Sequence, residues 1–325
     1  MPQPHLGQVH VDAVLTNISV AYLQRQENFI ADKVFPIVPV SKKSDLYFTY
    51  TKNDWLRDEA QRRADATESA GGGYNVSTDS YQADVWAFHK DVGDQTLANA
   101  DTPLNPLREA SEFVTHRLLL RRELQFVNDF LTINTWGTDV DGVSGTPSSG
   151  EFKYWSDYTS SDPLTDIEDG KATVLSNTGQ EPNTLVLGYD VFRQLKNHPE
   201  LVDRIKYTSS QTITTDMMAA MFDVDRVMVA KAIKATNNEG GSEAYDFAFG
   251  KSALLAFVAP SPGLMTPSAG YTFAWTGVSG GLGATIGISQ FRMESIKATR
   301  IEAEVAFDNK VVGADLGYFF NGAVA

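Results

Sequence analysis

Cysteine is absent from the 325 residues of this chain. Its absence excludes disulfide frameworks, zinc sites with thiolate ligands and thiol nucleophiles. Long apolar runs are also lacking, since the most continuous one, Ala253 to Ala259, is far too short to cross a bilayer. The first residues, MPQPHLGQVHVD, hold no basic segment followed by an apolar stretch. We therefore expect neither a signal peptide nor a membrane partner.

Positive charge is scarce as well. The chain has 27 Lys and Arg residues against 41 Asp and Glu residues, a formal net charge of -14. Proteins that hold nucleic acid tightly use basic groups to displace the counterions of the phosphates. We therefore expect any contact with DNA to be weak. The hydrophobic fraction of 42% is nevertheless enough for a real core, and the length predicts two domains or one elaborate one.

Motifs that carry chemistry are missing. The five histidines are scattered and form no H-E-x-x-H or paired ligand set, and no G-x-S-x-G elbow is present. The stretch TDVDGVSGT, with Asp139 and Asp141, lacks the spacing of a calcium loop and is predicted to be a turn. We predict no catalytic residues, no cofactor and no metal, and hence no enzyme.

Three consecutive glycines, Gly71 to Gly73, are the feature closest to a ligand-binding motif. A phosphate-binding loop needs a lysine at fixed spacing and a helix after it, whereas Tyr74 and a strand-like alternation follow here. A second alternating stretch, 45–52, precedes the charged residues before the glycines. We predict a long hairpin with a flexible tip and a register break near Asp79 and Ser80. Because a lone two-stranded ribbon is marginal in water, it should be supported from outside.

The clearest element is a long helix predicted over residues 105–136. Asn105 suits the N-cap and Pro106 the first helical position. Apolar residues at steps of three and four predict one buried stripe, formed by Ala110, Phe113, Leu120, Leu124, Val127 and Leu131. Arg117, Arg121 and Arg122 lie along or beside this stripe. They could contact neighbouring chains or packaged nucleic acid, or simply form a solvated face.

The remaining chain mixes short helices and strands, which indicates an α+β fold. Near the end, Ile301, Ala303, Val305 and Phe307 alternate with polar residues as in a half-buried strand, and a turn is predicted at Asp308–Asn309.

The first 45 residues or so are predicted to form an arm. Pro36 and Pro39 favour extended chain there, and its few apolar groups need another surface to cover them. An arm and a projecting hairpin on one chain favour a subunit that gains stability on assembly.

Several phrases of the sequence are similar to those of one protein family: ADKVFPIVPVSKKSDLYFTY, NTLVLGYDVFRQLKNHPELVDRIKY, RVMVAKAIKATNNEG, GKSALLAFVAPSPG and KATRIEAEVAFDNKVVGADLGYFF. The chain resembles the major capsid proteins of tailed bacteriophages that share the Hong Kong 97-type fold. The resemblance implies an N-terminal arm (1–44), an extended β-hairpin loop (45–90) and a peripheral domain (91–162) with a spine helix (105–136). An axial domain (163–289) and a C-terminal return to the peripheral domain (290–325) would follow.

The resemblance also implies a function. Such subunits form pentamers and hexamers that build an icosahedral shell around double-stranded DNA, assembled in the cytoplasm of the bacterial host. The partners implied are other copies of the chain, a portal, a decoration protein and a separate scaffolding protein, unless the chain is already processed. We place inter-subunit contacts of the extended loop at Trp55, Arg57, Arg62, Arg63 and Tyr74. Some members crosslink a lysine of this loop, but nothing singles out Lys52 and no crosslink is predicted.

Three other functions stay open at this point. The first is the shell of an encapsulin-like cellular nanocompartment, which has the same fold and encloses cargo proteins. The second is a soluble α+β enzyme, and the third is a tail or decoration protein, which the length and the long helix make less attractive.

Overall fold

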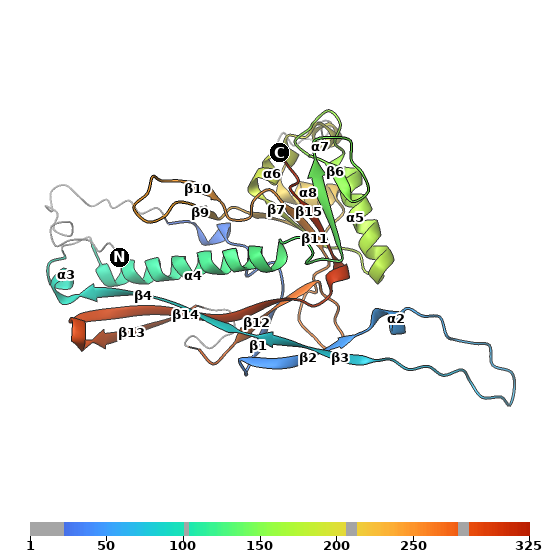
Figure 1. The fold of residues 1–325 in the computed structure, drawn as a ribbon, viewed down its shortest axis with the longest axis horizontal. Coiled ribbons are helices and arrows are strands. Elements are labelled where there is room, and N and C mark those ends of the chain that lie inside the picture. Colours follow the sequence, from blue (N-terminus) through green and yellow to red (C-terminus); the bar gives the residue numbers. More distant parts are fainter. Residues whose placement is uncertain (1–22, 101–103, 206–212, 279–285) are drawn as a thin grey trace.

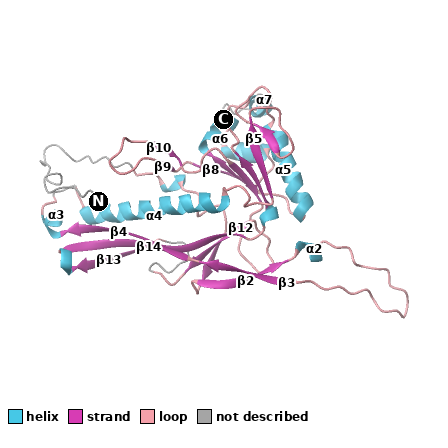
Figure 2. Ribbon diagram, viewed as in Figure 1, coloured by secondary structure: helices cyan, strands magenta, loops and turns pink. Residues whose placement is uncertain are grey.

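The computed structural model describes residues 23–100, 104–205, 213–278 and 286–325. These residues form an elongated layer, a compact part above one end of it, and a ribbon that projects beyond that end (Figure 1). The first half of the predicted arm, residues 1–22, lies outside the described residues. Figure 2 shows the mixed composition: long strands and one long helix in the elongated layer, shorter strands and helices in the compact part.

Strand β14 (Ala298–Val311) is the central strand of the elongated layer. One edge pairs antiparallel with β4 (Asp84–Gly93). The other edge pairs first with β13 (Gly287–Met293) and then with β12 (Gly270–Trp275), and β1 (Ile37–Val40) adds parallel to β12. The predicted inward face of Ile301, Ala303, Val305 and Phe307 is buried, as alternation in a half-covered strand requires.

The predicted turn at Asp308–Asn309 is wrong, because β14 runs through both residues. Their side chains have partners that hold the extended course. The Asn309 amide donates to Asp129 (2.9 Å), and its oxygen accepts from the Thr272 hydroxyl (3.0 Å). Asp308 accepts a hydrogen bond from the backbone of Gln82 (2.8 Å). Local turn propensity therefore yields to tertiary hydrogen bonding.

Helix α4 (Pro106–Phe130) lies along this sheet (Figure 1). The Asn105 side chain caps it by accepting from Arg108 N (3.2 Å). The helix ends at Phe130, earlier than the predicted 136. Trp136 folds back and its indole donates to the Phe130 carbonyl (2.6 Å), while Asn134 between them takes a left-handed conformation (φ 68°).

The prediction of a single buried stripe on this helix is also wrong. Residues at steps of four are buried: Ala110, Val114, Leu118, Arg122, Phe126 and Phe130. Leu120 and Leu124 pack on the other side, against Phe29 of the arm, whereas Phe113 is 36% exposed. The helix lies between two layers, so its apolar residues do not form the one-sided pattern of a surface helix.

The compact part is built on a six-stranded sheet in the order β6-β5-β15-β11-β7-β8. Its strands are β5 (Thr138–Val143), β6 (Glu151–Lys153), β7 (Thr184–Gly188), β8 (Arg226–Ala230), β11 (Ala253–Ala256) and β15 (Gly317–Asn321). The compact part also contains four helices: α5 (Pro163–Thr178), α6 (Tyr189–Lys196), α7 (Pro199–Ile205) and α8 (Thr215–Met221). One face packs Leu185, Leu255 and Phe320 against residues of α5 and its neighbours.

The opposite face of the six-stranded sheet joins the compact part to the rest. There Val186, Leu254 and Phe319 share a core with Phe126 and Phe130 of α4. Phe35 of the arm completes it, with its ring centroid 4.6 Å from that of Phe130. We call this cluster the junction core. Because both faces of the sheet are covered, β7 is buried along its whole length.

Sheet pairing crosses the predicted domain boundaries. Strands β5, β6 and β15 come from the predicted peripheral and return segments but pair within the sheet that contains β7, β8 and β11. Strand β12, from the predicted axial segment, pairs with β14 of the elongated layer. The boundaries were drawn along the chain, whereas these sheets combine segments far apart in sequence. The division into peripheral and axial domains remains a prediction.

Two small hairpins complete the fold. Strands β2 (Ser44–Tyr50) and β3 (Val76–Gln82) form the projecting ribbon, with α2 (Lys52–Trp55) at the start of its tip. Strands β9 (Ile233–Ala235) and β10 (Tyr245–Phe247) form a shorter hairpin near the arm. The predicted register break lies at Ala83, between β3 and β4, rather than at Asp79–Ser80. Four short elements remain: η1 (Gln26–Asn28), α3 (Asp94–Ala98), η2 (Glu294–Ile296) and η3 (Ala314–Leu316).

A glycine substitution tests the junction core, of which Trp136 is also a member. A Cβ on Gly317 would overlap the ring of Trp136. This ring is held in place by the hydrogen bond from its indole N–H to the Phe130 carbonyl. We expect Gly317→Ala to lower the free energy of unfolding by about 1–3 kcal/mol, as overpacking does. Gly71→Ala, where a Cβ meets nothing within 4 Å, should change it by less than about 0.5 kcal/mol. Urea unfolding of both variants measures this, and equal effects would contradict the packing described.

Candidate assembly surfaces

The ribbon is held to the body of the subunit by one of its faces. Tyr47 and Tyr81 pack on Phe273 of β12, with ring centroids 5.3 Å and 4.6 Å away, and the Tyr81 ring is nearly parallel to that of Phe273. The Tyr47 hydroxyl donates to Asp79 (2.9 Å), and burial together with this carboxylate raises the pKa of Tyr47. The support that the sequence required from outside the ribbon thus comes partly from the same chain.

The opposite face of the ribbon carries four exposed apolar side chains, beside the exposed Thr78 and Ser80 of β3. Phe48 is 64% exposed, Leu46 63%, Val76 49% and Tyr50 38%. Leu46, Phe48 and Tyr50 alternate along β2, and Val76 lies directly opposite Tyr50 on β3, so all four side chains share one side. We call these four residues the ribbon face. Contiguous exposed apolar groups of this kind mark interaction sites.

An aromatic trio closes the outer end of the ribbon. The Trp55 and Tyr74 ring centroids lie 5.3 Å apart, and Tyr50 lies 6.3 Å and 6.2 Å from them. Asp54 accepts a hydrogen bond from Asn75 N (2.9 Å), which links the two sides at the same level. The structure therefore brings together two predicted contact residues, Trp55 and Tyr74, and adds Tyr50, which sequence reasoning placed only in a strand.

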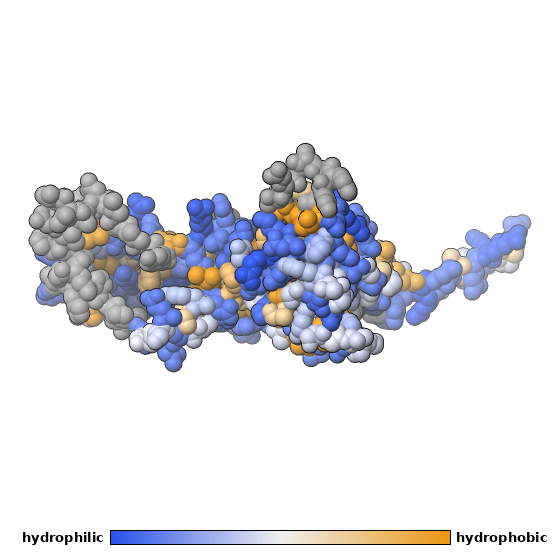
Figure 3. Space-filling view, turned by 90° about the horizontal axis from the view of Figure 1, so that it is seen from above, coloured by the Kyte–Doolittle hydropathy of each residue, from blue (hydrophilic) through white to orange (hydrophobic). Residues whose placement is uncertain are grey.

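The predicted arginines of the loop do not form one site. Arg57 pairs with Glu59 (3.0 Å), Arg63 donates to the Thr67 carbonyl, and Arg62 is exposed. They are spread along a tip whose glycines, 71–73, are exposed. Figure 3 shows this tip as a narrow, mainly hydrophilic projection, with apolar groups gathered where it leaves the body. The tip therefore exposes charged side chains, whereas the side chains of the ribbon face are apolar.

Lys52 is engaged within its own subunit. Its ammonium pairs with Asp315, just before β15, and both side chains are nearly half exposed. Such a surface pair contributes little to stability, so it guides the start of the tip without fixing it.

The three predicted helix arginines have different environments. The Arg117 guanidinium lies 5.1 Å from the Phe113 ring and is exposed, and that of Arg121 lies 3.9 Å from the Trp86 ring. Arg122 is only 5% exposed and lies toward Phe307 of the sheet, and burial lowers its pKa. Arg122 therefore lies inside the subunit, which corrects the prediction that it faces a neighbour or packaged DNA.

Sequence reasoning missed the residue that anchors the arm. Glu123 is fully buried, and one of its oxygens accepts from the backbone N–H groups of Ile30 (3.0 Å) and Ala31 (2.9 Å). Burial raises the pKa of Glu123 to about 7. Around it, Phe29 and Phe35 of the arm are buried in cores of the same chain, so this part of the arm finds its surface there. The available signal was an acidic residue within the apolar part of the helix.

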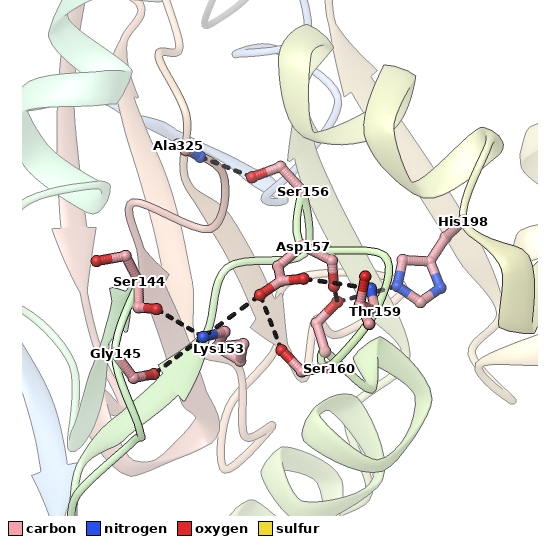
Figure 4. A network of polar contacts seen from close by, with 10 residues as sticks. Ser144, Gly145, Lys153, Ser156, Asp157, Thr159, Ser160, His198 and Ala325 are labelled. Carbon is pink, nitrogen blue, oxygen red and sulfur yellow. Dashed lines mark hydrogen bonds and ion pairs between the residues drawn. The ribbon is translucent and has the colours of Figure 1, made fainter.

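A polar network fixes the loop before α5 (Figure 4). Lys153 donates to the carbonyls of Ser144 (2.6 Å) and Gly145 (3.2 Å) and pairs with Asp157 (3.3 Å). Asp157 in turn accepts from Ser160 (2.8 Å). The ammonium and the carboxylate thus close a compact loop.

A buried serine–histidine pair adjoins this network. Ser161 Oγ lies 3.0 Å from Nε2 of His198, but it donates its proton to the Asp157 carbonyl (2.7 Å). Both residues are buried, and burial lowers the pKa of His198. A hydroxyl committed to a carbonyl and closed off from solvent has the features of a structural tie between the loop and α7, not of a nucleophile.

Among residues 23–100, 104–205, 213–278 and 286–325, no three His, Asp or Glu side chains are grouped to hold a metal ion. None of the helices in the described part has the length and apolar character needed to cross a membrane.

Comparison with known proteins gives a consistent result. No protein-family profile matches the chain. It is 26% identical to the major capsid protein of Burkholderia phage BcepMu, over 96% of each chain, and 27% identical to that of Pseudomonas phage JBD67, over 97% of each. A crystal structure of a phage-related protein from Bordetella bronchiseptica RB50 superposes with a TM-score of 0.67 at 24% identity, covering 92% of this chain and 94% of that one.

The chain has the Hong Kong 97-type capsid fold. The predicted resemblance to phage major capsid proteins and the predicted α+β capsid fold are both confirmed. From the predicted organisation we keep two names, extended loop for the ribbon with its tip and spine helix for α4. That these parts have the corresponding roles remains a prediction.

The anchoring of the extended loop of this capsid fold can be tested. Tyr81 is almost fully buried against Phe273. We expect Tyr81→Ala to destabilise the ribbon locally by about 2 kcal/mol, which is about thirtyfold faster amide exchange in β2 and β3. Exchange in β7 and β11 should not change. Tyr74→Ala, at the exposed end, is the matched control and should affect the root of the ribbon less. Unchanged exchange in the Tyr81 variant would show that the stack does not hold the ribbon.

Proposed function

We propose that this chain is the major capsid subunit of a tailed phage, a structural protein without catalytic activity. Copies of it would assemble into pentamers and hexamers and then into an icosahedral shell around double-stranded DNA. The observation that carries the proposal is the similarity to two phage major capsid proteins along nearly the whole of each chain. The exposed apolar ribbon face supplies the physical reason for self-assembly.

The ribbon face is best covered by another copy of the chain. Within the subunit, the ribbon is fixed through Phe273 on one side only, and its other side carries four apolar groups in water. Burying a large apolar side chain contributes about 1.5–3 kcal/mol. Because the ribbon projects beyond the body, an adjacent subunit in a ring can provide that burial (Figure 1).

The predicted contact residues have separate roles in this interface. We propose that Trp55 and Tyr74 extend the apolar contact, and that Arg57, Arg62 and Arg63 at the tip pair with acidic groups of a neighbour. Arg117, exposed on the spine helix, is proposed to face a neighbouring chain or the interior. The axial domain is proposed to centre on β7, β8 and β11, and the peripheral domain on α4 and β14.

Further partners follow from the proposed role. A portal, a separate scaffolding protein and a decoration protein would join the shell, which would assemble in the cytoplasm of the bacterial host and end in the virion. Contacts with the packaged DNA would be weak, because the net charge of -14 provides few counterion-releasing groups.

A nanocompartment shell is the second candidate. The SrpI encapsulin of Synechococcus elongatus PCC 7942 superposes with a TM-score of 0.58, over 96% of this chain and 93% of that one, at 12% identity. A likeness at this identity supports the fold and not the cargo. The similarity in sequence to phage capsid proteins favours a phage shell. Particles purified from infected or lysogenic cells separate the two, since a phage shell would contain DNA and a nanocompartment would contain an enzyme.

A substitution on the ribbon face tests self-assembly. Phe48→Ser should leave the subunit as stable as before, because Phe48 is exposed, but should remove about 2 kcal/mol of burial at the interface. We expect the subunit concentration needed for assembly to rise about thirtyfold. Sedimentation of a concentration series measures it.

Gln61→Ser, at the exposed tip, is the control and should assemble as the unaltered chain does. If the Phe48 variant also forms shells at the same concentration as the unaltered chain, the ribbon face is not an assembly contact.

A further inference from the structure

The contact between the arm and the spine helix depends on one buried carboxyl group. Glu123 has no exposed surface, and its Oε2 accepts both arm N–H groups, from Ile30 and Ala31. Its Oε1 is buried without a hydrogen-bond partner among the described residues. A carboxylate buried in this way is costly unless it gains a proton or returns to water.

Of the charged groups around this carboxyl, some favour its ionised form and others its neutral form. On the arm, Asp32 repels a second negative charge, while Lys33 donates to the Phe29 carbonyl (3.0 Å). On the helix, the Arg122 guanidinium favours the ionised form of Glu123. From β8, Arg226 donates to the carbonyl of Val34 (2.8 Å). Another titratable group at the contact is His116, whose Nε2 accepts from Gln24 N (3.4 Å).

Opening of the arm would change the surroundings of Glu123. The arm covers it through Phe29, Ile30, Ala31 and Phe35, which are all buried, and residues 23–28 lead away along the helix. If this segment lifts, the carboxyl group reaches water and its burial ends. Ionisation of Glu123 and opening of the arm are therefore linked, as any two equilibria that share one group must be.

We propose that Glu123 is a proton-linked latch, which takes up a proton when the arm closes over the spine helix and loses it when the arm opens. The neutral group retains a carbonyl oxygen that accepts both N–H groups and avoids a buried negative charge beside Asp32. The latch belongs to the single subunit and does not depend on the proposed shell function.

The direction of the pH dependence follows from the pKa of Glu123. Burial raises it to about 7 with the arm closed, against the ordinary value of 4.5 for the exposed group. The closed arm therefore binds more protons than the open arm between these values. Closure is favoured below about pH 7 and weakens as the pH rises through that value. Between pH 5 and pH 8 the ratio of closed to open arm should fall on the order of a hundredfold.

The absence of cysteine allows a direct test. A nitroxide on Gln26→Cys reports the mobility of the arm in the full chain, and one on Thr49→Cys in the ribbon serves as the control position. We expect the mobile fraction at Gln26 to rise from pH 6 to pH 8.5 and to stay constant at Thr49. Glu123→Gln keeps the shape and the acceptor oxygen but cannot titrate, so the pH dependence at Gln26 should vanish.

A second variant separates a latch from a merely structural contact. Asp32→Asn removes the nearby negative charge and should move the midpoint of the transition to lower pH while leaving the arm able to close. An arm that loosens equally with pH in the Glu123→Gln variant would overturn the proposal. So would an unaltered chain whose arm is more mobile at pH 6 than at pH 8.5, or an Asp32→Asn variant whose midpoint moves to higher pH.

Discussion

The junction core is the constraint on which the rest of the structure depends. Phe126 and Phe130 end the spine helix, Phe35 ends the buried part of the arm, and Val186, Leu254 and Phe319 form one face of the six-stranded sheet. Because all three parts contribute to a single apolar cluster, none can bury its residues without the others. The cluster fixes the long helix to the compact part, and the ribbon projects beyond that end of the subunit (Figure 1).

From this junction, the subunit divides into a rigid interior and an exposed projection. The spine helix packs against β14 on one side and against the arm on the other. Contacts on both sides therefore fix its position. The ribbon packs on the body through one face, around Phe273, and presents apolar groups on its free side. The subunit buries large apolar side chains at its centre but leaves those of the ribbon face exposed. Such a subunit is suited to associate with copies of itself.

Elements with strong local patterns could be predicted from the sequence. The N-cap at Asn105, the inward face of β14 and the paired strands of the ribbon all follow from spacing along the chain. Features set by distant residues could not. Asp308 and Asn309 read as a turn because their partners, Gln82 and Asp129, lie far away in sequence. The same holds for Arg122, which was expected at an interface or on a solvated face, and for Glu123, which the sequence analysis did not single out. For the candidate interface, Trp55 and Tyr74 were identified, whereas the exposure of the ribbon face depends on which side Phe273 covers.

An electron cryomicroscopy reconstruction of particles formed by the purified chain of 325 residues is the most direct test of assembly through the ribbon face. We expect closed icosahedral shells in which Leu46 and Phe48 of each ribbon are buried against the adjacent subunit. Small discrete oligomers without shells, or shells in which the ribbon face remains in solvent, would contradict it.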